Sequence, residues 1–273
     1  MPELPEVETI KNEISHKLIG RHIKEIILLW DGIVKLPSVE EFKTKLTGRK
    51  IRDLNRRGKY LLVGLNYADT LIIHLKMSGS LLITSENTEV PKYTRAILKL
   101  DDGTVVYFRD PRKFGRMWLV GDIDTVVGKL GPEALSRELS PKRLAEIMSK
   151  RKAPIKALLC DQGLIAGIGN LYADEALFEA KIHPMRTGES LTQDEIIGLH
   201  KAIREVLLAG IKNKGASIVN YYRPDGTTGT AHCEFRVAHR KGETCFVCGT
   251  PIQRIVVRGR GTYFCPKCQV RPI

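Results

Sequence analysis

Four of the six cysteines lie near the C-terminal end of the chain, in two Cys-x2-Cys pairs. Cys245 and Cys248 form the first pair, Cys265 and Cys268 form the second, and sixteen residues separate the two pairs. Zn²⁺ takes four thiolates in a closed tetrahedral structural site, and this spacing is typical of such sites. Two disulfides are the alternative, which a reducing compartment disfavours. The pattern predicts one structural zinc ion in a small finger over residues 236–273.

The charge balance of the chain indicates a polyanionic partner. Its 273 residues include 44 Lys and Arg against 31 Asp and Glu, which gives a formal net charge of +13. An excess of this size favours nucleic acid over a membrane surface. No uninterrupted apolar run approaches the ~18 residues of a membrane span, and the first residues do not have the pattern of a secretory signal. We therefore expect a cytoplasmic monomer with no membrane partner.

The first residues can supply a nucleophile if the initiator Met1 is removed. The new terminus would be the secondary amine of Pro2, and an α-amino group titrates at roughly pKa 8, so part of it is neutral at cellular pH. Amines form Schiff bases with carbonyl carbons, and Glu3 is near enough to act as an acid or base. The alternative is a plain proline-rich lead-in to a helix. Pro5 suits the first turn of that helix, whose apolar face would be Val7, Ile10, Ile14 and Leu18.

Short alternating segments after this helix predict a β-sandwich domain. The Asp102-Gly103 pair between two of the segments is a hairpin signal. Many short strands separated by turns, after one leading helix, indicate two packed sheets, and we place this domain at residues 1–121. The expected strands are 22–30, 50–54, 60–65, 71–75, 81–84, 96–100 and 105–109.

Three connections in this domain have basic or bulky tips. Residues 56–59 read Arg-Arg-Gly-Lys, a turn that suits phosphate contact as well as a solvated corner. The loops at 74–79 and 110–115 are tight and end in Gly. Met77 and Phe114 suit the core when each is considered alone. Together with Arg112 they could instead form a wedge that enters a base stack.

The second half of the chain has the pattern of a helical domain. A polar linker is expected at 122–137 and the helical domain at 138–235, where Thr192 and Glu195 form a capping box for a long helix. The Gly-rich turn before Asn170 would direct backbone N–H groups at an anion. Residues 215–230 are too small and polar to pack, so we expect a functional or disordered loop there. Between the cysteine pairs, residues 254–261 predict a hairpin with a basic tip.

Taken together, these motifs resemble the formamidopyrimidine-DNA glycosylase family, the bacterial enzymes that remove 8-oxoguanine and ring-opened purines from DNA. The resemblance covers essentially the whole chain. It implies an α+β multidomain fold, with an N-terminal β-sandwich and leading helix, a helical domain with a helix–two-turn–helix at 154–180, and the C-terminal zinc finger. It also implies a base-excision repair enzyme that is both a glycosylase and an apurinic/apyrimidinic-site lyase on damaged double-stranded DNA. The matching segments are 1–9, 56–59, 74–79, 110–115, 166–170, the four-cysteine finger and 259–262.

The same resemblance assigns roles to individual residues. Pro2 corresponds to the nucleophile at C1′ of the damaged nucleotide, and Glu3 to the acid that assists base departure. Lys59 and Arg260 correspond to the proton donors of β- and δ-elimination. Zinc is then structural, because this chemistry needs no metal. Residues that match DNA contacts are Tyr93, Arg112, Lys152, Asn170 and Arg260. Those that fill the void left by the flipped base are Met77, Arg112 and Phe114, with Arg112 facing the orphaned cytosine.

Two segments depart from the family pattern. The family's Lys-His-Asp-His reads Lys-Tyr-Thr-Arg at 92–95, so Tyr93 replaces a DNA-contacting His. The family's Val-Tyr-Gly-Arg reads Val-Ala-His-Arg at 237–240. In addition, residues 217–230 match the family's lesion-covering loop. The departures at 92–95 and 237–240 bear on the damage preference and on how the lesion-covering loop docks.

Two other functions are open to a chain with these features. An endonuclease VIII-like glycosylase would use the same terminus on oxidised pyrimidines, but the intact set of Met77, Arg112 and Phe114 argues against it. A non-catalytic DNA-binding protein with a zinc ribbon would explain the charge and the cysteines. It would not explain the Pro2-Glu3 terminus.

Overall fold

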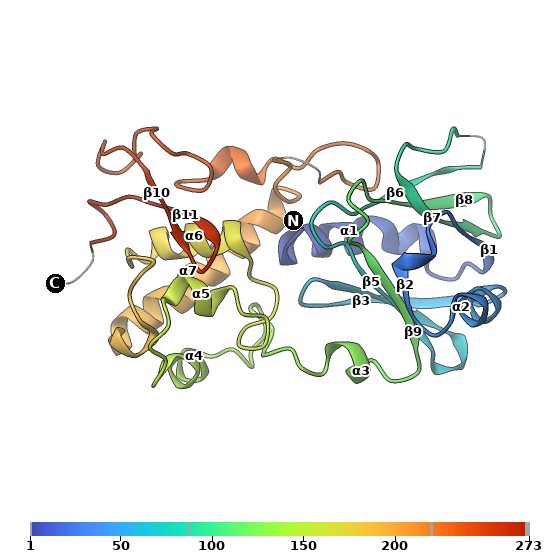
Figure 1. Ribbon diagram of the computed structural model, residues 1–273, viewed down its shortest axis with the longest axis horizontal. Coiled ribbons are helices and arrows are strands. Elements are labelled where there is room, and N and C mark those ends of the chain that lie inside the picture. Colours follow the sequence, from blue (N-terminus) through green and yellow to red (C-terminus); the bar gives the residue numbers. More distant parts are fainter. Residues whose placement is uncertain (1, 87, 219–220, 271–273) are drawn as a thin grey trace. The chain divides into compact units, whose positions relative to one another are not determined.

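The computed structural model describes residues 2–86, 88–218 and 221–270, which form two compact units (Figure 1). Unit 1 comprises Met1–Lys129 and Asn213–Thr230, and unit 2 comprises Leu130–Lys212 and Ala231–Ile273. The chain therefore leaves the first unit, builds most of the second, and returns to the first before it completes the second. Within the described residues, no helix is both long and apolar enough to span a bilayer.

Unit 1 is a sandwich of two sheets with a leading helix, as expected from the sequence. The helix α1 (Leu4–Leu18) opens the unit, and α2 (Val39–Leu46) and α3 (Asp124–Val127) are shorter. One sheet has the order β1 (Ile23–Leu28), β7 (Thr94–Leu100), β8 (Thr104–Arg109), β6 (Ser80–Ser85), all antiparallel. The other has the order β2 (Val34–Leu36), β9 (Arg116–Val120), β5 (Thr70–His74), β4 (Tyr60–Leu65), β3 (Ile51–Arg57), in which only the β2–β9 pair is parallel.

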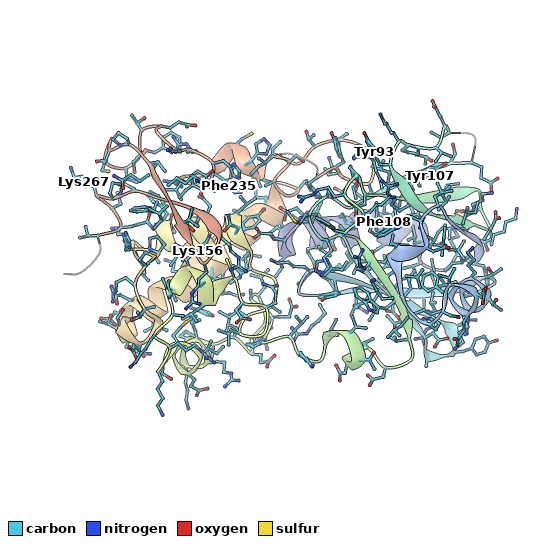
Figure 2. All side chains as sticks on the ribbon, in the orientation of Figure 1. Tyr93, Tyr107, Phe108, Lys156, Phe235 and Lys267 are labelled. Atoms are coloured by element: carbon cyan, nitrogen blue, oxygen red, sulfur yellow. The ribbon has the colours of Figure 1, made fainter. Side chains whose placement is uncertain are left out.

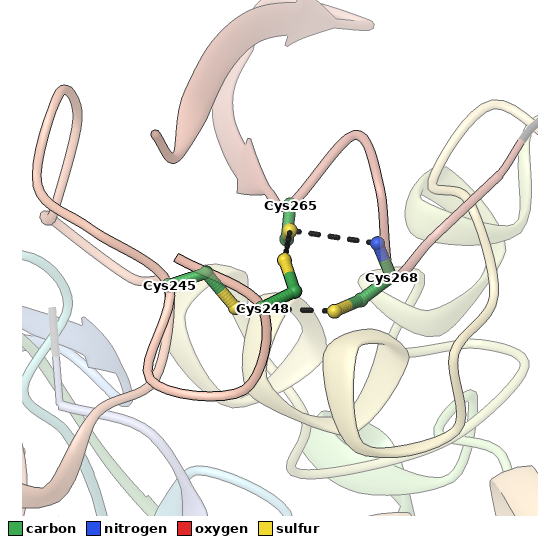
Figure 3. Close-up of side chains that lie close together, drawn as sticks. All are labelled: Cys245, Cys248, Cys265 and Cys268. Carbon is green, nitrogen blue, oxygen red and sulfur yellow. Dashed lines mark hydrogen bonds between the residues drawn. The ribbon is translucent and has the colours of Figure 1, made fainter. Parts of the chain in front are cut away.

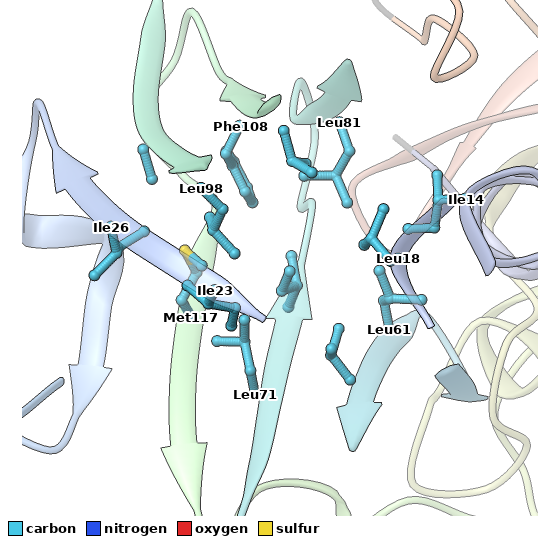
Figure 4. Packing of buried hydrophobic residues seen from close by; sticks show 14 of the residues in the cluster. Ile14, Leu18, Ile23, Ile26, Leu61, Leu71, Leu81, Leu98, Phe108 and Met117 are labelled. Carbon is cyan, nitrogen blue, oxygen red and sulfur yellow. The ribbon is translucent and has the colours of Figure 1, made fainter. Parts of the chain in front are cut away.

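The core of unit 1 lies between the two sheets and is closed by α1 (Figure 4). Alternate residues of each strand point inward because successive side chains of a strand lie on opposite faces. Burial of this apolar surface is the main stabilising contribution to the unit. Core side chains from α1 and from both sheets include Ile14, Leu18, Ile23, Leu61, Leu71, Leu81, Leu98, Phe108 and Met117.

Three local expectations for unit 1 differ from the structure. The strand β3 continues through Arg57, because Arg56 and Arg57 pair with Leu61 and Tyr60 of β4, so the basic turn is confined to Gly58 and Lys59. The polar segment 122–137, expected as a linker, contains α3. The segment 215–230 was expected to be too small and polar to pack, yet part of its described residues does pack. Tyr221 is only 6% exposed and belongs to the core of unit 1.

In its described residues, unit 2 combines four α-helices and two short 3-10 helices with one hairpin. The capping box predicted for the long helix is confirmed, since Glu195 N–H donates to Thr192 Oγ1 at 3.2 Å and Thr192 N–H donates to a Glu195 carboxylate oxygen at 2.8 Å. The predicted basic-tipped hairpin is also present. The helices are α4 (Pro141–Met148), α5 (Ile155–Leu159), α6 (Asn170–Glu179) and α7 (Gln193–Lys212), and the hairpin strands are β10 (Gln253–Val257) and β11 (Arg260–Phe264).

Candidate active site and zinc centre

The N-terminal residues of unit 1 are buried and fixed from the side of α1. Pro2 and Glu3 precede the first helical residue, and Glu3 is 1% exposed. The Glu3 N–H donates to Glu6 Oε2 at 2.7 Å, as in a capping box. The peptide that follows Pro2 is therefore held by a buried carboxylate, which leaves little freedom for the proline itself.

The other oxygen of the same carboxylate holds the returning segment. Glu6 Oε1 accepts from Ala216 N–H at 2.8 Å. Further along, the Arg223 guanidinium donates to Glu13 Oε1 through Nε at 2.9 Å and Nη2 at 2.7 Å. Burial, with the nearby carboxylates of Glu6 and Glu13, raises the pKa of Tyr221. Helix α1 thus fixes both the N-terminus and the segment Asn213–Thr230.

The β3–β4 turn places a buried lysine close to a buried histidine, since Tyr60, the residue after Lys59, pairs with His74 of β5. Lys59 lies in the β3–β4 turn and is 4% exposed. Burial, and after it the charges of Lys76 and Lys59, lower the pKa of His74 to about 3. His74 Nδ1 accepts from Lys76 N–H at 2.9 Å, so the proton of the neutral ring is on Nε2. The Tyr60 ring packs edge-on against the imidazole, with centroids 4.4 Å apart.

The three residues of the predicted wedge lie on two loops that the structure brings together. Met77 lies on the 74–79 loop and is 45% exposed, and Phe114 lies on the 110–115 loop and is 40% exposed. The Arg112 guanidinium lies 4.7 Å from the centre of the Phe114 ring. The two loops are connected through Ser78, whose hydroxyl donates to the carboxylate of Asp110. The apolar and cationic side chains of the two loops are therefore exposed, whereas the hydrogen bond that connects the loops is buried.

A groove of about 500 Å³ runs beside this pair of loops. Two cations, Lys76 and Arg116, line it. Burial and the nearby Arg116 charge lower the pKa of Lys76. The orientation of Arg116 is fixed, since its Nη1 donates to the carbonyl oxygens of Lys113 at 3.0 Å and Gly115 at 2.7 Å. Such a surface suits an anionic chain. The groove is lined by Lys35, Lys76, Met77, Phe114, Arg116 and Trp118.

Tyr93, which replaces the family's His and is labelled in Figure 2, lies just before β7. Two cations lie near its ring, with Lys92 Nζ 5.1 Å and the Arg109 guanidinium 5.7 Å from the ring centre. The same guanidinium lies 5.5 Å from the Tyr222 ring of the returning segment. Arg109 is thus in contact with two aromatic rings from separate parts of unit 1.

In unit 2, a buried ion pair joins α5 to α6, and residues of α6 also bind the hairpin. Lys156, labelled in Figure 2, donates to Asp174 Oδ1 at 2.6 Å, and both side chains are fully buried. Asp174 Oδ2 accepts from Tyr263 N–H of β11 at 3.1 Å, and Asn170 Nδ2 donates to Gly261 O at 2.9 Å. Burial raises the pKa of Asp174, and the Lys156 ammonium opposes that rise.

These contacts place two of the predicted DNA-contacting residues of unit 2 together. Asn170 is the first residue of α6, and Arg260 is the first residue of β11 and is exposed. The Asn170–Gly261 hydrogen bond lies one residue from Arg260. Lys152 is exposed on the segment between α4 and α5.

The four cysteine sulfurs of the finger converge on one point (Figure 3). All four lie within 4.8 Å of one another, with Sγ–Sγ distances of 3.9 Å for Cys245–Cys268 and 3.4 Å for Cys248–Cys265. A tetrahedron with Zn–S bonds of about 2.3 Å requires sulfurs about 3.8 Å apart, so the donor set fits Zn²⁺. With all four positions taken by thiolates, the zinc is structural.

The finger is tied to α6 of the same unit by buried contacts. Phe178 of α6 packs with Cys245 and Cys265. Gln269, fully buried, accepts from Cys265 N–H and donates to Ile182 O, each at 2.9 Å. On the chain entering the finger, the Glu175 carboxylate accepts from three consecutive backbone N–H groups, those of residues 236–238, at 2.7–2.9 Å.

Four buried polar residues of this site were given no role by the sequence motifs, although some of them lie within those motifs. They are Glu6, His74, Asp110 and Glu175, all under 9% exposed. Asp110 could have been found, because an Asp before a Pro in a Gly-ended turn commonly accepts from backbone N–H groups further along the turn. Glu6 and Glu175 also accept from amides that lie 210 and 61–63 residues away, which no local pattern signals.

Comparison with known proteins identifies families along most of the chain. Residues 1–117 match the formamidopyrimidine-DNA glycosylase N-terminal domain, residues 130–221 match the formamidopyrimidine-DNA glycosylase H2TH domain, and residues 242–270 match the zinc finger found in FPG and IleRS.

Complete relatives and solved structures agree with these matches. The formamidopyrimidine-DNA glycosylase of Chloroflexus aurantiacus is 46% identical, with 99% of this chain and 98% of that one covered, and the Roseiflexus sp. protein of the same name is 43% identical over 98% and 100%. A complex of a Lactococcus lactis FPG mutant with DNA containing Fapy-dG has a TM-score of 0.92 at 38% identity, covering 99% and 100% of the two chains. The L. lactis Fpg complex with abasic-site DNA also has a TM-score of 0.92, at 36% identity over 98% and 100%. The chain belongs to the formamidopyrimidine-DNA glycosylase family.

Proposed function

We propose that the chain is a base-excision repair DNA glycosylase and apurinic/apyrimidinic-site lyase that removes 8-oxoguanine and formamidopyrimidines. The observation that carries this proposal is the terminus, where Pro2 and Glu3 are buried at the start of α1 and the Glu3 amide is fixed by Glu6 at 2.7 Å. The substrate class comes from the names of the relatives and from the lesion-containing DNA of the similar structures.

The reaction begins with the amine of Pro2. Once Met1 is removed, this secondary amine attacks C1′ of the damaged nucleotide, and Glu3 supplies the proton that assists base departure. The resulting iminium is cationic and makes the neighbouring C–H protons acidic. Elimination of both flanking phosphates follows, with Lys59 and Arg260 as proton donors.

The damaged nucleotide must leave the helix before this chemistry, and other residues stabilise the opened duplex. Flipping costs a few kcal/mol of lost stacking. Met77, Arg112 and Phe114 fill the vacated space, with Arg112 at the orphaned cytosine. Tyr93, Lys152 and Asn170 contact the DNA, and residues 217–230 cover the lesion. Of these residues, 219 and 220 lie outside the described part of the chain.

Borohydride trapping tests the nucleophile. Duplexes that contain 8-oxoguanine, an oxidised pyrimidine or an abasic site are incubated with protein and reductant, and any adduct is mapped by peptide sequencing. We expect adducts at residue 2 with 8-oxoguanine and abasic DNA, and none in a variant that retains Met1, whose presence makes the Pro2 nitrogen an amide. An adduct on a lysine would refute the assignment, and trapping mainly on the pyrimidine lesion would indicate the endonuclease VIII-like alternative.

The role of Glu3 is tested by comparing two substrates. Glu3→Gln should lose excision of 8-oxoguanine far more than cleavage at a preformed abasic site, because an abasic aldehyde is already electrophilic and needs no departing base. Single-turnover rates on both substrates provide the comparison. Equal losses on the two substrates would assign Glu3 a structural role.

Three further expectations from the sequence stay proposals. The partner is damaged double-stranded DNA, bound by a monomer. The protein works in the bacterial cytoplasm, in association with the nucleoid. Its domains are 1–121, 138–235 and 236–273, with a linker at 122–137.

A further inference from the structure

Beneath the two loops that hold Met77, Arg112 and Phe114 lies a single fully buried carboxylate, that of Asp110. Its side chain is 0% exposed. Oδ1 accepts from the Ser78 hydroxyl and from Arg112 N–H at 3.2 Å. Oδ2 accepts from Phe114 N–H and Gly115 N–H, each at 2.7 Å. Four donors from two loops therefore share one acceptor group.

Each of the three exposed side chains is tied to Asp110 through a hydrogen bond of its own residue or of the next residue in the chain. Arg112 and Phe114 are held through their own backbone N–H groups. Met77 precedes Ser78, which is 1% exposed and donates its hydroxyl across to the other loop. Hydrogen bonds of N–H and O–H groups to an ionised carboxylate are roughly twice as strong as those between neutral groups. The relative position of the two loops thus depends on the charge and shape of Asp110.

The surrounding backbone leaves the 110–115 loop little room to shift. A Cβ at Gly115 would lie 2.5 Å from ring atoms of Phe108, so the loop end is pressed onto the core. The Asp110 backbone is also fixed, since its N–H donates to Tyr93 O at 2.9 Å and its carbonyl accepts from Arg95 Nε at 2.8 Å. The carboxylate is therefore a fixed point against which both loops are set.

We propose that Asp110 is a positioning residue for base flipping, and that its carboxylate sets Met77, Arg112 and Phe114 as one rigid wedge. This inference rests on the proposed function, in which these side chains replace the flipped base. Asp110 touches no reacting atom. Its effect is expected only where a base must leave the stack and where Arg112 must meet the opposite base.

The test compares Asp110→Asn with Ser78→Ala and with a matched control. In Asp110→Asn an amide N–H₂ replaces one of the two accepting oxygens. This N–H₂ donor would then face the two donors that now bind that oxygen. Ser78→Ala removes only the bond between the loops and leaves the three backbone bonds in place. The control is Asp102→Asn, in the β7–β8 turn outside both loops, where the carboxylate accepts from Thr104 N–H at 3.0 Å and pairs with Arg21 Nε at 2.9 Å.

Three rates are measured for each protein under single turnover: excision of 8-oxoguanine opposite cytosine, the same opposite adenine, and cleavage at a preformed abasic site. Displacing a positioned group by about 1 Å can cost roughly 100-fold. We therefore expect Asp110→Asn to slow excision opposite cytosine by about 10- to 100-fold and to narrow the cytosine-to-adenine ratio. Abasic cleavage should change by less than about threefold, Ser78→Ala should follow in the same direction with a smaller effect, and Asp102→Asn should match wild type.

The possible outcomes separate this inference from the proposed function. Absence of excision and of trapping in the wild type would refute the proposed function itself. Active wild type with an unchanged cytosine-to-adenine ratio in Asp110→Asn, or with equal slowing on all three substrates, would overturn the positioning role. If Asp110→Asn does not fold, the ratio measured for Ser78→Ala decides the question.

Discussion

The buried His74 should make the stability of unit 1 depend on pH in a calculable way. Its pKa is about 3 in the folded protein, against a usual value of about 6.5. At a pH between these two values, His74 binds a proton in the unfolded chain but not in the folded protein. The contribution of neutral His74 to the free energy of unfolding is therefore fully present above pH 6.5 and is lost as the pH falls. Each pH unit in that window costs about 1.4 kcal/mol, so a shift from pH 7 to pH 5 should cost about 2 kcal/mol through this one residue.

His74→Asn is the informative perturbation. The Asn side chain can still accept from Lys76 N–H, as Nδ1 does at 2.9 Å, but it does not titrate. Loss of the edge-on contact with Tyr60 should cost about 0.5–1.5 kcal/mol at every pH, in addition to the free energy lost with the buried surface of the ring. The variant should therefore be less stable at pH 7, and the two stability curves should converge toward pH 5.

Tryptophan fluorescence during urea unfolding follows the relevant unit, because both tryptophans, Trp30 and Trp118, lie in unit 1. The exposed His16 on α1 supplies the control, since His16→Gln should keep the wild-type pH dependence. Parallel stability curves for wild type and His74→Asn between pH 7 and pH 5 would show that the His74 pKa is not depressed.

Three further results are expected. Lys156→Met should destabilise unit 2 by about 3–5 kcal/mol in thermal unfolding followed by circular dichroism, because it leaves a buried carboxylate without its cation. Adding Asp174→Leu should recover part of that loss but not all of it, since Tyr263 N–H then lacks its acceptor. No recovery at all would argue against an isolated buried charge as the cause. Removal of zinc by chelation, or Cys248→Ser, should weaken DNA affinity and expose the finger to proteolysis, because metal binding supplies folding energy to such modules; full affinity in verified metal-free protein would contradict this. Arg112→Ala should slow excision opposite cytosine and narrow its advantage over adenine, since a misplaced polar pair costs ~1–3 kcal/mol, while Phe114→Ala should slow both alike; an unchanged ratio in Arg112→Ala would refute its role at the orphaned base.

Elements set by local periodicity could be predicted from the sequence. The strands near 60–65 and 105–109, the capping box at Thr192 and the zinc site all depend on residues close together or on a fixed spacing, and all are present. The same holds for the sandwich class, because alternation and turn signals determine it.

What could not be predicted depends on partners distant in sequence. Tyr221 lies in a segment of small and polar residues, and its place in the core of unit 1, together with the bonds of Ala216 to Glu6 and of Arg223 to Glu13, holds that segment. Glu6 accepts from an amide 210 residues away. The strand β3 extends past the basic residues Arg56 and Arg57 because β4 offers them pairing partners, which outweighs the turn signal of the following Gly58.

The division of unit 1 between two stretches of chain has a consequence for its biosynthesis. The ribosome adds Ala216, whose amide completes the anchorage of Glu6, and Tyr221, whose ring fills part of the core, about 90 residues after residue 129. At about 5–20 residues per second, the ribosome takes roughly 5–20 s to supply them. During that interval the nascent N-terminus lacks its final contacts. Removal of Met1 can therefore take place on a chain whose terminus is not yet enclosed.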